Sequence, residues 1–211
     1  AIGQNALGTE DEGGYNVAIG YNALATQDAG NAYNVAVGAS AGAGVTTGTL
    51  NTIVGGLAGN SLTTGSSNVA IGYEALTTED GHGRNVAVGH QALKTLNANA
   101  EGYNIAVGYN AGTLMTTGVH NTIIGGLAGD SLTTGGYNVA IGKGALATED
   151  TGGYNVAIGL NALNVQDAGT DAYNTAIGAS AGVSVTSGTH NTLVGAIAGD
   201  AITTGDSNVA L

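Results

Sequence analysis

The chain has 211 residues and a formal net charge of −12, because 15 acidic side chains are opposed by only three lysines and arginines. Nucleic acids and anionic membranes attract clustered basic residues, so this composition argues against both as partners. The 39 glycines occur without any proline, which excludes a collagen triple helix, and the 43% apolar residues argue against disorder. No run of about 18 apolar residues is present, so the sequence predicts no membrane-inserted segment.

A five-residue phrase, Asn-Val-Ala-Ile-Gly or a close variant, recurs twelve times at spacings of 17 to 19 residues. Four kinds of unit alternate within a longer repeat of 70 residues. A fixed period of this length is typical of a solenoid, in which each unit forms one coil. We therefore expect an all-β fold, a parallel β-solenoid (β-roll or β-helix) of about twelve coils that forms a single domain over residues 1–211. Both ends fall within a repeat, so we expect a segment of a longer fibre or a stacking unit.

The apolar centre of each phrase predicts a short strand, first at 17–19 and last at 209–211. Two further extended pieces, such as 22–24 and 62–65, complete the coil, with glycine at the corners. Side chains alternate along a strand, so Val17 and Ile19 share one face and Ala18 takes the other. Neither face carries a charge in any copy, which is typical of a strand buried on both sides.

One of the two strand faces can line the interior of the coil, and the other then needs a partner. We expect the alanine face, whose small side chains permit close approach, to contact another copy of the chain. The chain-interface candidates are Ala18, Ala36, Ala70, Ala87, Ala106, Ala140, Ala157 and Ala176. The asparagine that begins each phrase has two interpretations: it forms an amide ladder between coils, or it tolerates the turn before the strand.

The phrases NVAIGYNAL, NVAIGYEAL, NTIVGGLAG and NTIIGGLAG resemble two related groups of repeats. One is the left-handed parallel β-roll in the head of trimeric autotransporter adhesins. The other is the repetitive region of phage tail fibres with NTAIGYxAL-type units. The resemblance covers the whole chain, although the coils here are longer than the usual adhesin repeat. It implies a homotrimer that is extracellular, on a cell surface or part of a virion.

Acidic residues at loop positions suggest a calcium site, because carboxylates one coil apart should stack about 4.8 Å from each other. The calcium-ligand candidates are Asp11, Asp28, Asp150 and Asp167. The middle copy of this pair is Asp80 with Asn97, and no known calcium-loop motif is present. Solvated loops that keep a fibre soluble are the favoured interpretation, and we expect no cofactor.

Aromatic residues recur directly before the asparagine of the phrase. Their flat faces could stack on sugars, or they could pack against neighbouring coils. The glycan-contact candidates are Tyr15, Tyr33, Tyr103, Tyr137, Tyr154 and Tyr173. His120 and His190 occupy the same column, so a packing role is expected for them rather than metal ligation.

The sequence therefore predicts a structural fibre or filament protein that supports surface attachment and has no enzyme activity. No cysteine is present, and no recognisable Ser-His-Asp motif occurs. A glycan-binding adhesin that uses the tyrosines is the alternative. An ice-binding solenoid is a further alternative, because Thr-Thr columns such as Thr63–Thr64 recur, although acidic loops interrupt them.

Overall fold

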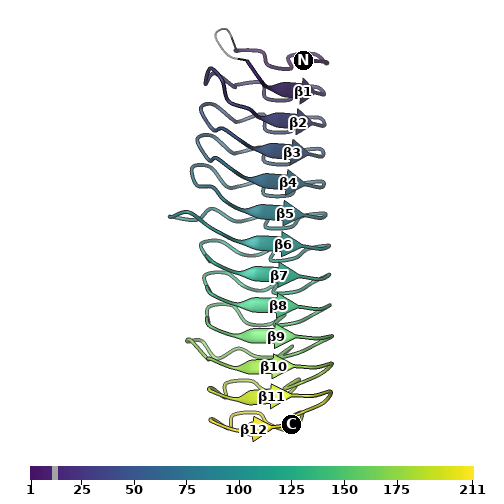
Figure 1. Ribbon diagram of the computed structural model, residues 1–211, viewed down its shortest axis with the longest axis vertical. Coiled ribbons are helices and arrows are strands. Elements are labelled where there is room, and N and C mark those ends of the chain that lie inside the picture. Colours follow the sequence, from purple (N-terminus) through teal and green to yellow (C-terminus); the bar gives the residue numbers. More distant parts are fainter. Residues whose placement is uncertain (11–13) are drawn as a thin grey trace. The chain divides into compact units, whose positions relative to one another are not determined.

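The chain forms an all-β parallel β-solenoid of about eleven turns with about 17 residues in each turn (Figure 1). The computed structural model describes residues 1–10 and 14–211, and none of these residues lies in a helix. The chain separates into two compact units, Ala1–Tyr103 and Asn104–Leu211. The fold class predicted from the repeat is confirmed.

Each unit contains a parallel sheet whose strands follow one another in chain order. Adjacent strands pair at equivalent repeat positions, so that Val17 lies beside Val35 and Ala18 beside Ala36. The described part of the first unit contains β1 (Val17–Ile19), β2 (Val35–Val37), β3 (Thr52–Val54), β4 (Val69–Ile71) and β5 (Val86–Val88). The second contains β6 (Ile105–Val107), β7 (Thr122–Ile124), β8 (Val139–Ile141), β9 (Val156–Ile158), β10 (Thr175–Ile177), β11 (Thr192–Val194) and β12 (Val209–Ala210).

A glycine follows each strand from β1 to β11, and at most of these corners both its backbone angle and the next coil require it. Gly72 has a φ of 134°, and a Cβ atom there would lie 2.3 Å from the carbonyl oxygen of Gly89. Gly142 has the same φ and would meet Gly159 at the same distance. Any side chain at this corner would push two coils apart, so glycine permits the close stacking.

Other corners use left-handed backbone at residues that are not glycine. In the coil that contains β4, Ser67, Glu74 and Leu76 have φ values of 61°, 53° and 51°. Such a conformation is unfavourable for a residue with a side chain. Each of the three donates its backbone N–H to a carbonyl of an adjacent coil, at 2.9, 3.1 and 3.0 Å. The hydrogen bonds between coils therefore help to hold the strained corners.

The alanine face of the strands points into the interior of the coil, which corrects the interface assignment made from the sequence. All eight alanines are no more than 1% exposed within the single chain. A side chain enclosed by its own coil cannot contact a second chain, so Val and Ile form the outward face. The residues that were assigned to a chain interface and instead lie in the interior are Ala18, Ala36, Ala70, Ala87, Ala106, Ala140, Ala157 and Ala176.

The interior is filled by complementary residues from different parts of the coil. Where the inward strand residue is Ala70, the buried Leu76 also lies in the interior. Where it is the larger Ile53, the corresponding corner is Gly59, and a Cβ atom there would lie 3.3 Å from Ile53 Cδ1. Large and small residues are thus exchanged between strand and corner to conserve volume, as close packing requires.

The asparagine ladder is present in both units. The side-chain oxygen of Asn51 accepts the backbone N–H of Asn68 at 2.9 Å, and that of Asn121 accepts the N–H of Asn138 at the same distance. The amide nitrogen of Asn51 donates to Gly65 O at 2.9 Å. Asn51 and Asn121 are no more than 1% exposed. The buried amides therefore hold neighbouring coils in register, and the ladder interpretation of the sequence is the correct one.

Candidate functional site

The outward face of each sheet is an apolar surface made by the first and third residues of every strand. Val17 and Ile19 are 45% and 39% exposed, and in the second unit Ile105 and Ile177 are 41% and 39% exposed. Only Val, Ile and Thr occupy these positions in β1 to β11, so none of them is charged. We call these two columns the outer face. Its regular apolar surface differs from the isolated apolar residues that ordinary protein surfaces show.

Aromatic rings border the outer face along the column that precedes the asparagine. Tyr15 and Tyr33 stack in the first unit with ring centroids 4.9 Å apart. The second unit has a run of five stacked rings with centroid distances of 4.9 to 5.3 Å. This run, which we call the ring ladder, consists of His120, Tyr137, Tyr154, Tyr173 and His190. The expected equivalence of these histidines and tyrosines is confirmed.

The six glycan-contact candidates all lie on the surface, but the stacking changes what a ligand would meet. Their exposed fractions run from 43% at Tyr154 to 69% at Tyr15. Within the ring ladder the planes are nearly parallel, with interplanar angles of 4° and 12° on either side of Tyr154. Neighbouring rings therefore cover part of each face, whereas sugar stacking needs an open face. Tyr137, Tyr154 and Tyr173 therefore offer mainly ring edges and hydroxyl groups, whereas Tyr15 and Tyr33 cover one face of each other. Glycan contact by Tyr15, Tyr33, Tyr103, Tyr137, Tyr154 and Tyr173 stays a prediction.

In the Thr-Thr columns, the first threonine of each pair helps to hold the coils together. Thr63 Oγ1 donates to Asp80 O at 2.7 Å, and Thr133 Oγ1 donates to Asp150 O at 3.0 Å. Thr46 and Thr186 donate to the next coil in the same way. Hydroxyl groups that are bonded to the backbone are less suited to binding an ice lattice.

A buried carboxylate lies below the surface in each unit. Glu79 and Glu149 are both 0% exposed. They occupy a column of the interior in which neighbouring coils place apolar residues such as Leu62 and Leu132. The acidic loops were expected to be solvated, and the burial of Glu79 and Glu149 differs from that expectation. The seventeen-residue spacing from Leu62 to Glu79 is the signal that would have revealed it.

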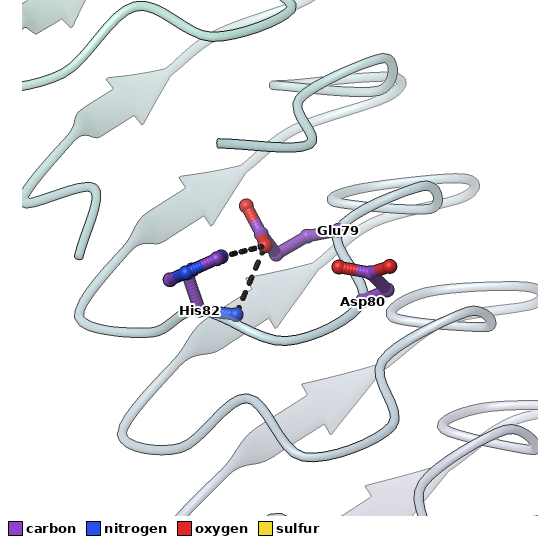
Figure 2. Close-up of side chains that lie close together, drawn as sticks. All are labelled: Glu79, Asp80 and His82. Carbon is purple, nitrogen blue, oxygen red and sulfur yellow. Dashed lines mark hydrogen bonds and ion pairs between the residues drawn. The ribbon is translucent and has the colours of Figure 1, made fainter. Parts of the chain in front are cut away.

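Glu79 is held by backbone groups and by a neighbouring imidazole. Its Oε1 accepts the backbone N–H of His82 at 3.1 Å, and its Oε2 accepts that of Ala98 at 3.2 Å. The Nδ1 atom of His82 lies 3.8 Å from Oε1, and Figure 2 shows the ring directed toward the carboxylate. Burial raises the pKa of Glu79, against the opposing effect of these N–H donors and His82.

Glu149 is held by a side-chain amide instead of an imidazole. Its Oε1 accepts the backbone N–H of Gly152 at 2.7 Å. Its Oε2 accepts Gln166 Nε2 at 2.9 Å and the backbone N–H of Ala168 at 3.4 Å. Gln166 Oε1 in turn accepts Asn174 Nδ2 at 2.9 Å. This is a connected buried network whose polar atoms have partners.

The structure brings together one of the two predicted pairs of calcium-ligand candidates. One oxygen each of Glu149, Asp150 and Asp167 lies within 4.8 Å of the others. Glu149 is the member that sequence reasoning missed, and its oxygens already accept three N–H groups. Asp28 is exposed, and Asp11 lies outside the described residues. Calcium binding by these residues stays a prediction.

No family model matches the chain, and neither a curated protein nor a solved structure does. Among the described residues there is no helix long and apolar enough to cross a membrane. No pocket is found in the described part of the chain. Function is therefore argued from the surface of the solenoid and from its side-chain clusters.

Proposed function

We propose that this protein is a structural segment of an extracellular or virion fibre, in which copies of the chain associate laterally through the outer face as a homotrimer. The observation that carries this proposal is the uncharged outer face, exposed in the single chain. Burying its Val and Ile side chains would contribute about 25 cal/mol for each Å² of apolar surface removed from water. The extracellular or virion location and the chain number of three rest on the resemblance of the repeats.

A second copy of the chain is the partner that best fits such a surface. The outer face repeats once per coil, at about 4.8 Å from strand to strand. A partner must present an equally long and regular apolar surface to cover it. Another copy necessarily does so, and closed symmetric assemblies of one chain are the commonest oligomers.

The distribution of charge supports the same partner. Acidic residues are absent from the outer face and from the ring column beside it. That column contains tyrosines and one cation, Arg84, whose Nη1 donates to Tyr103 Oη at 2.9 Å. Interfaces are depleted in charge and enriched in tyrosine and arginine. The acidic loops would remain in solvent and limit aggregation beyond the closed assembly.

The proposal is tested by charging the outer face. We expect the double variant Ile71→Lys and Ile141→Lys, one change per unit, to remain folded and to become monomeric, because an unpaired buried charge costs several kcal/mol. Sedimentation equilibrium measures the chain number, and circular dichroism checks the fold. The control is Thr64→Lys with Thr134→Lys at exposed positions. A monomeric wild-type protein, or a folded double variant that assembles normally, would refute lateral association.

A further inference from the structure

We propose that Glu79, Asp80 and His82 form a binding site for a divalent transition-metal ion, with the Glu79 carboxylate and His82 Nδ1 as its principal ligands. The inference is independent of the fibre function. One ligand atom from each residue lies within 4.8 Å of the other two. All three belong to one short loop, shown in Figure 2.

The separation of imidazole and carboxylate suits a shared ion better than a direct bond. Nδ1 of His82 lies 3.8 Å from Glu79 Oε1, which is too long for a hydrogen bond. Zinc binds histidine nitrogen at about 2.0–2.1 Å and carboxylate oxygen at about 2.0–2.2 Å. Two ligands of one such ion therefore lie within about 4.3 Å of each other. An ion between these atoms requires little movement of either side chain.

His82 supplies the observation that points to a ligand. Its Nδ1 atom is buried and has no hydrogen-bond partner among the described residues. A buried polar atom without a partner costs about 1–3 kcal/mol. A metal ion would satisfy the lone pair of neutral imidazole, because nitrogen is a preferred ligand of zinc, copper and nickel.

The Glu79 carboxylate is buried, and its oxygens keep lone pairs that a metal ion can use. The backbone N–H groups of His82 and Ala98 each bond one carboxylate oxygen and fix its orientation. Each oxygen can accept a second interaction. Hydrogen bonds of this kind orient ligands in metal sites. Asp80 is exposed, so it provides the third oxygen at the solvent edge, where water molecules complete the coordination.

The same loop in the second unit shows why the site is specific to the first. Gly152 replaces His82, so no imidazole is present. The Glu149 oxygens accept three N–H groups, including the amide of Gln166 at 2.9 Å. The mixed nitrogen and oxygen ligands at Glu79 favour a transition metal over calcium, which takes six to eight oxygen ligands.

Isothermal titration of the EDTA-treated full chain with zinc chloride tests the proposal. We expect one zinc ion per chain at Glu79, and an affinity at least about tenfold lower in His82→Gly, which introduces the residue found in the second unit. Glu79→Gln should weaken binding similarly. Glu149→Gln and His190→Ala are the matched controls and should bind as the wild type does. Binding should also weaken as the pH falls, because protons compete with zinc for the ligand atoms.

Three outcomes would overturn the metal site. One is the absence of zinc binding by the wild-type chain. The second is unchanged binding in folded His82→Gly and Glu79→Gln, as judged by circular dichroism. The third is an equal loss in the Glu149→Gln control, which would place the ion in the second unit.

Discussion

The buried carboxylates of Glu79 and Glu149 occupy equivalent coils but are stabilised by different neighbours. Both accept backbone N–H groups from three residues downstream, His82 at 3.1 Å and Gly152 at 2.7 Å. Glu149 also accepts the side-chain amide of Gln166 from the next coil, whereas Leu96 occupies the corresponding position beside Glu79.

The difference shows how a repeat protein can vary its chemistry without changing its backbone. A carboxylate that accepts several N–H groups serves as a structural connection between coils. A carboxylate with fewer N–H donors keeps lone pairs that can interact with an imidazole or a metal ion. The first unit is therefore the part of the chain where metal binding is proposed. The equivalent loop of the second unit, which lacks the histidine, is the internal control for that binding.

The largest effect is expected when the Glu149 network loses its amide. Gln166→Leu should lower the free energy of unfolding by about 1–3 kcal/mol, because it removes a donor from a buried carboxylate. Urea denaturation measures this change. Gln91→Leu removes a similar hydrogen bond to Glu74 in a less buried place and should cost less. Equal losses in the two variants would show that burial does not distinguish them.

A smaller effect is expected in the pH dependence of stability. Since burial raises the pKa of folded Glu79 above its ordinary value of 4.5, the folded chain binds more protons than the unfolded chain just above that pH. The contribution of Glu79 to stability therefore falls as the pH rises from 4.5 through the folded pKa. Glu79→Gln should reduce this fall.

Denaturation at several pH values on both sides of 4.5 and up to about 7 measures the slope. Glu74→Gln is the informative control, because the hydrogen bond from Lys94 lowers the pKa of Glu74. Its stabilising contribution is present above pH 4.5 and is lost as the pH falls through the lowered pKa, which is the opposite sign. An identical slope in wild type and Glu79→Gln would contradict the assignment.

The smallest effect is expected from making the first site resemble the second. Leu96→Gln should supply a donor to Glu79 and lower its pKa toward the ordinary range, since hydrogen bonds to the charged form favour it. Carboxyl chemical shifts followed by NMR against pH measure the pKa. Leu96→Met adds no donor and should leave it raised. An unchanged pKa in Leu96→Gln would show that a side-chain amide at this position does not favour the charged form of Glu79.

The period of the sequence predicts the solenoid, the parallel register and the one strand of each coil. The two further extended pieces expected in each coil are not found, because residues 22–24 form a turn and residues 63–64 form a bend. Asn22 and Leu24 have left-handed φ values of 54° and 48°.

The period does not by itself decide which strand face is inside. The missing signal was the exchange of volume between strand and corner, in which Ile53 is accompanied by Gly42 and Gly59. A Cβ atom on Gly42 would lie 2.8 Å from Ile53 Cδ1. When the size of the central strand residue changes together with the size of a corner residue, both must lie in the interior. This relation places the alanine face of the strand inside the coil.

The candidate metal site was less predictable, because two neighbouring residues of one acidic loop have opposite environments. Glu79 is buried and Asp80 is exposed, as alternation along an extended segment allows. The column of Leu62, Glu79 and Leu96 indicates burial once coils are aligned. The left-handed corners at Glu74 and Leu76 were not predictable from glycine placement, since inter-coil hydrogen bonds hold them.

Lateral association through the outer face is the central claim, and cryo-electron microscopy of the purified protein tests it most directly. We predict particles with three chains whose Val and Ile columns face a shared centre and whose acidic loops lie outside. Isolated single chains, or an assembly joined through the acidic loops with the outer face in solvent, would contradict the claim.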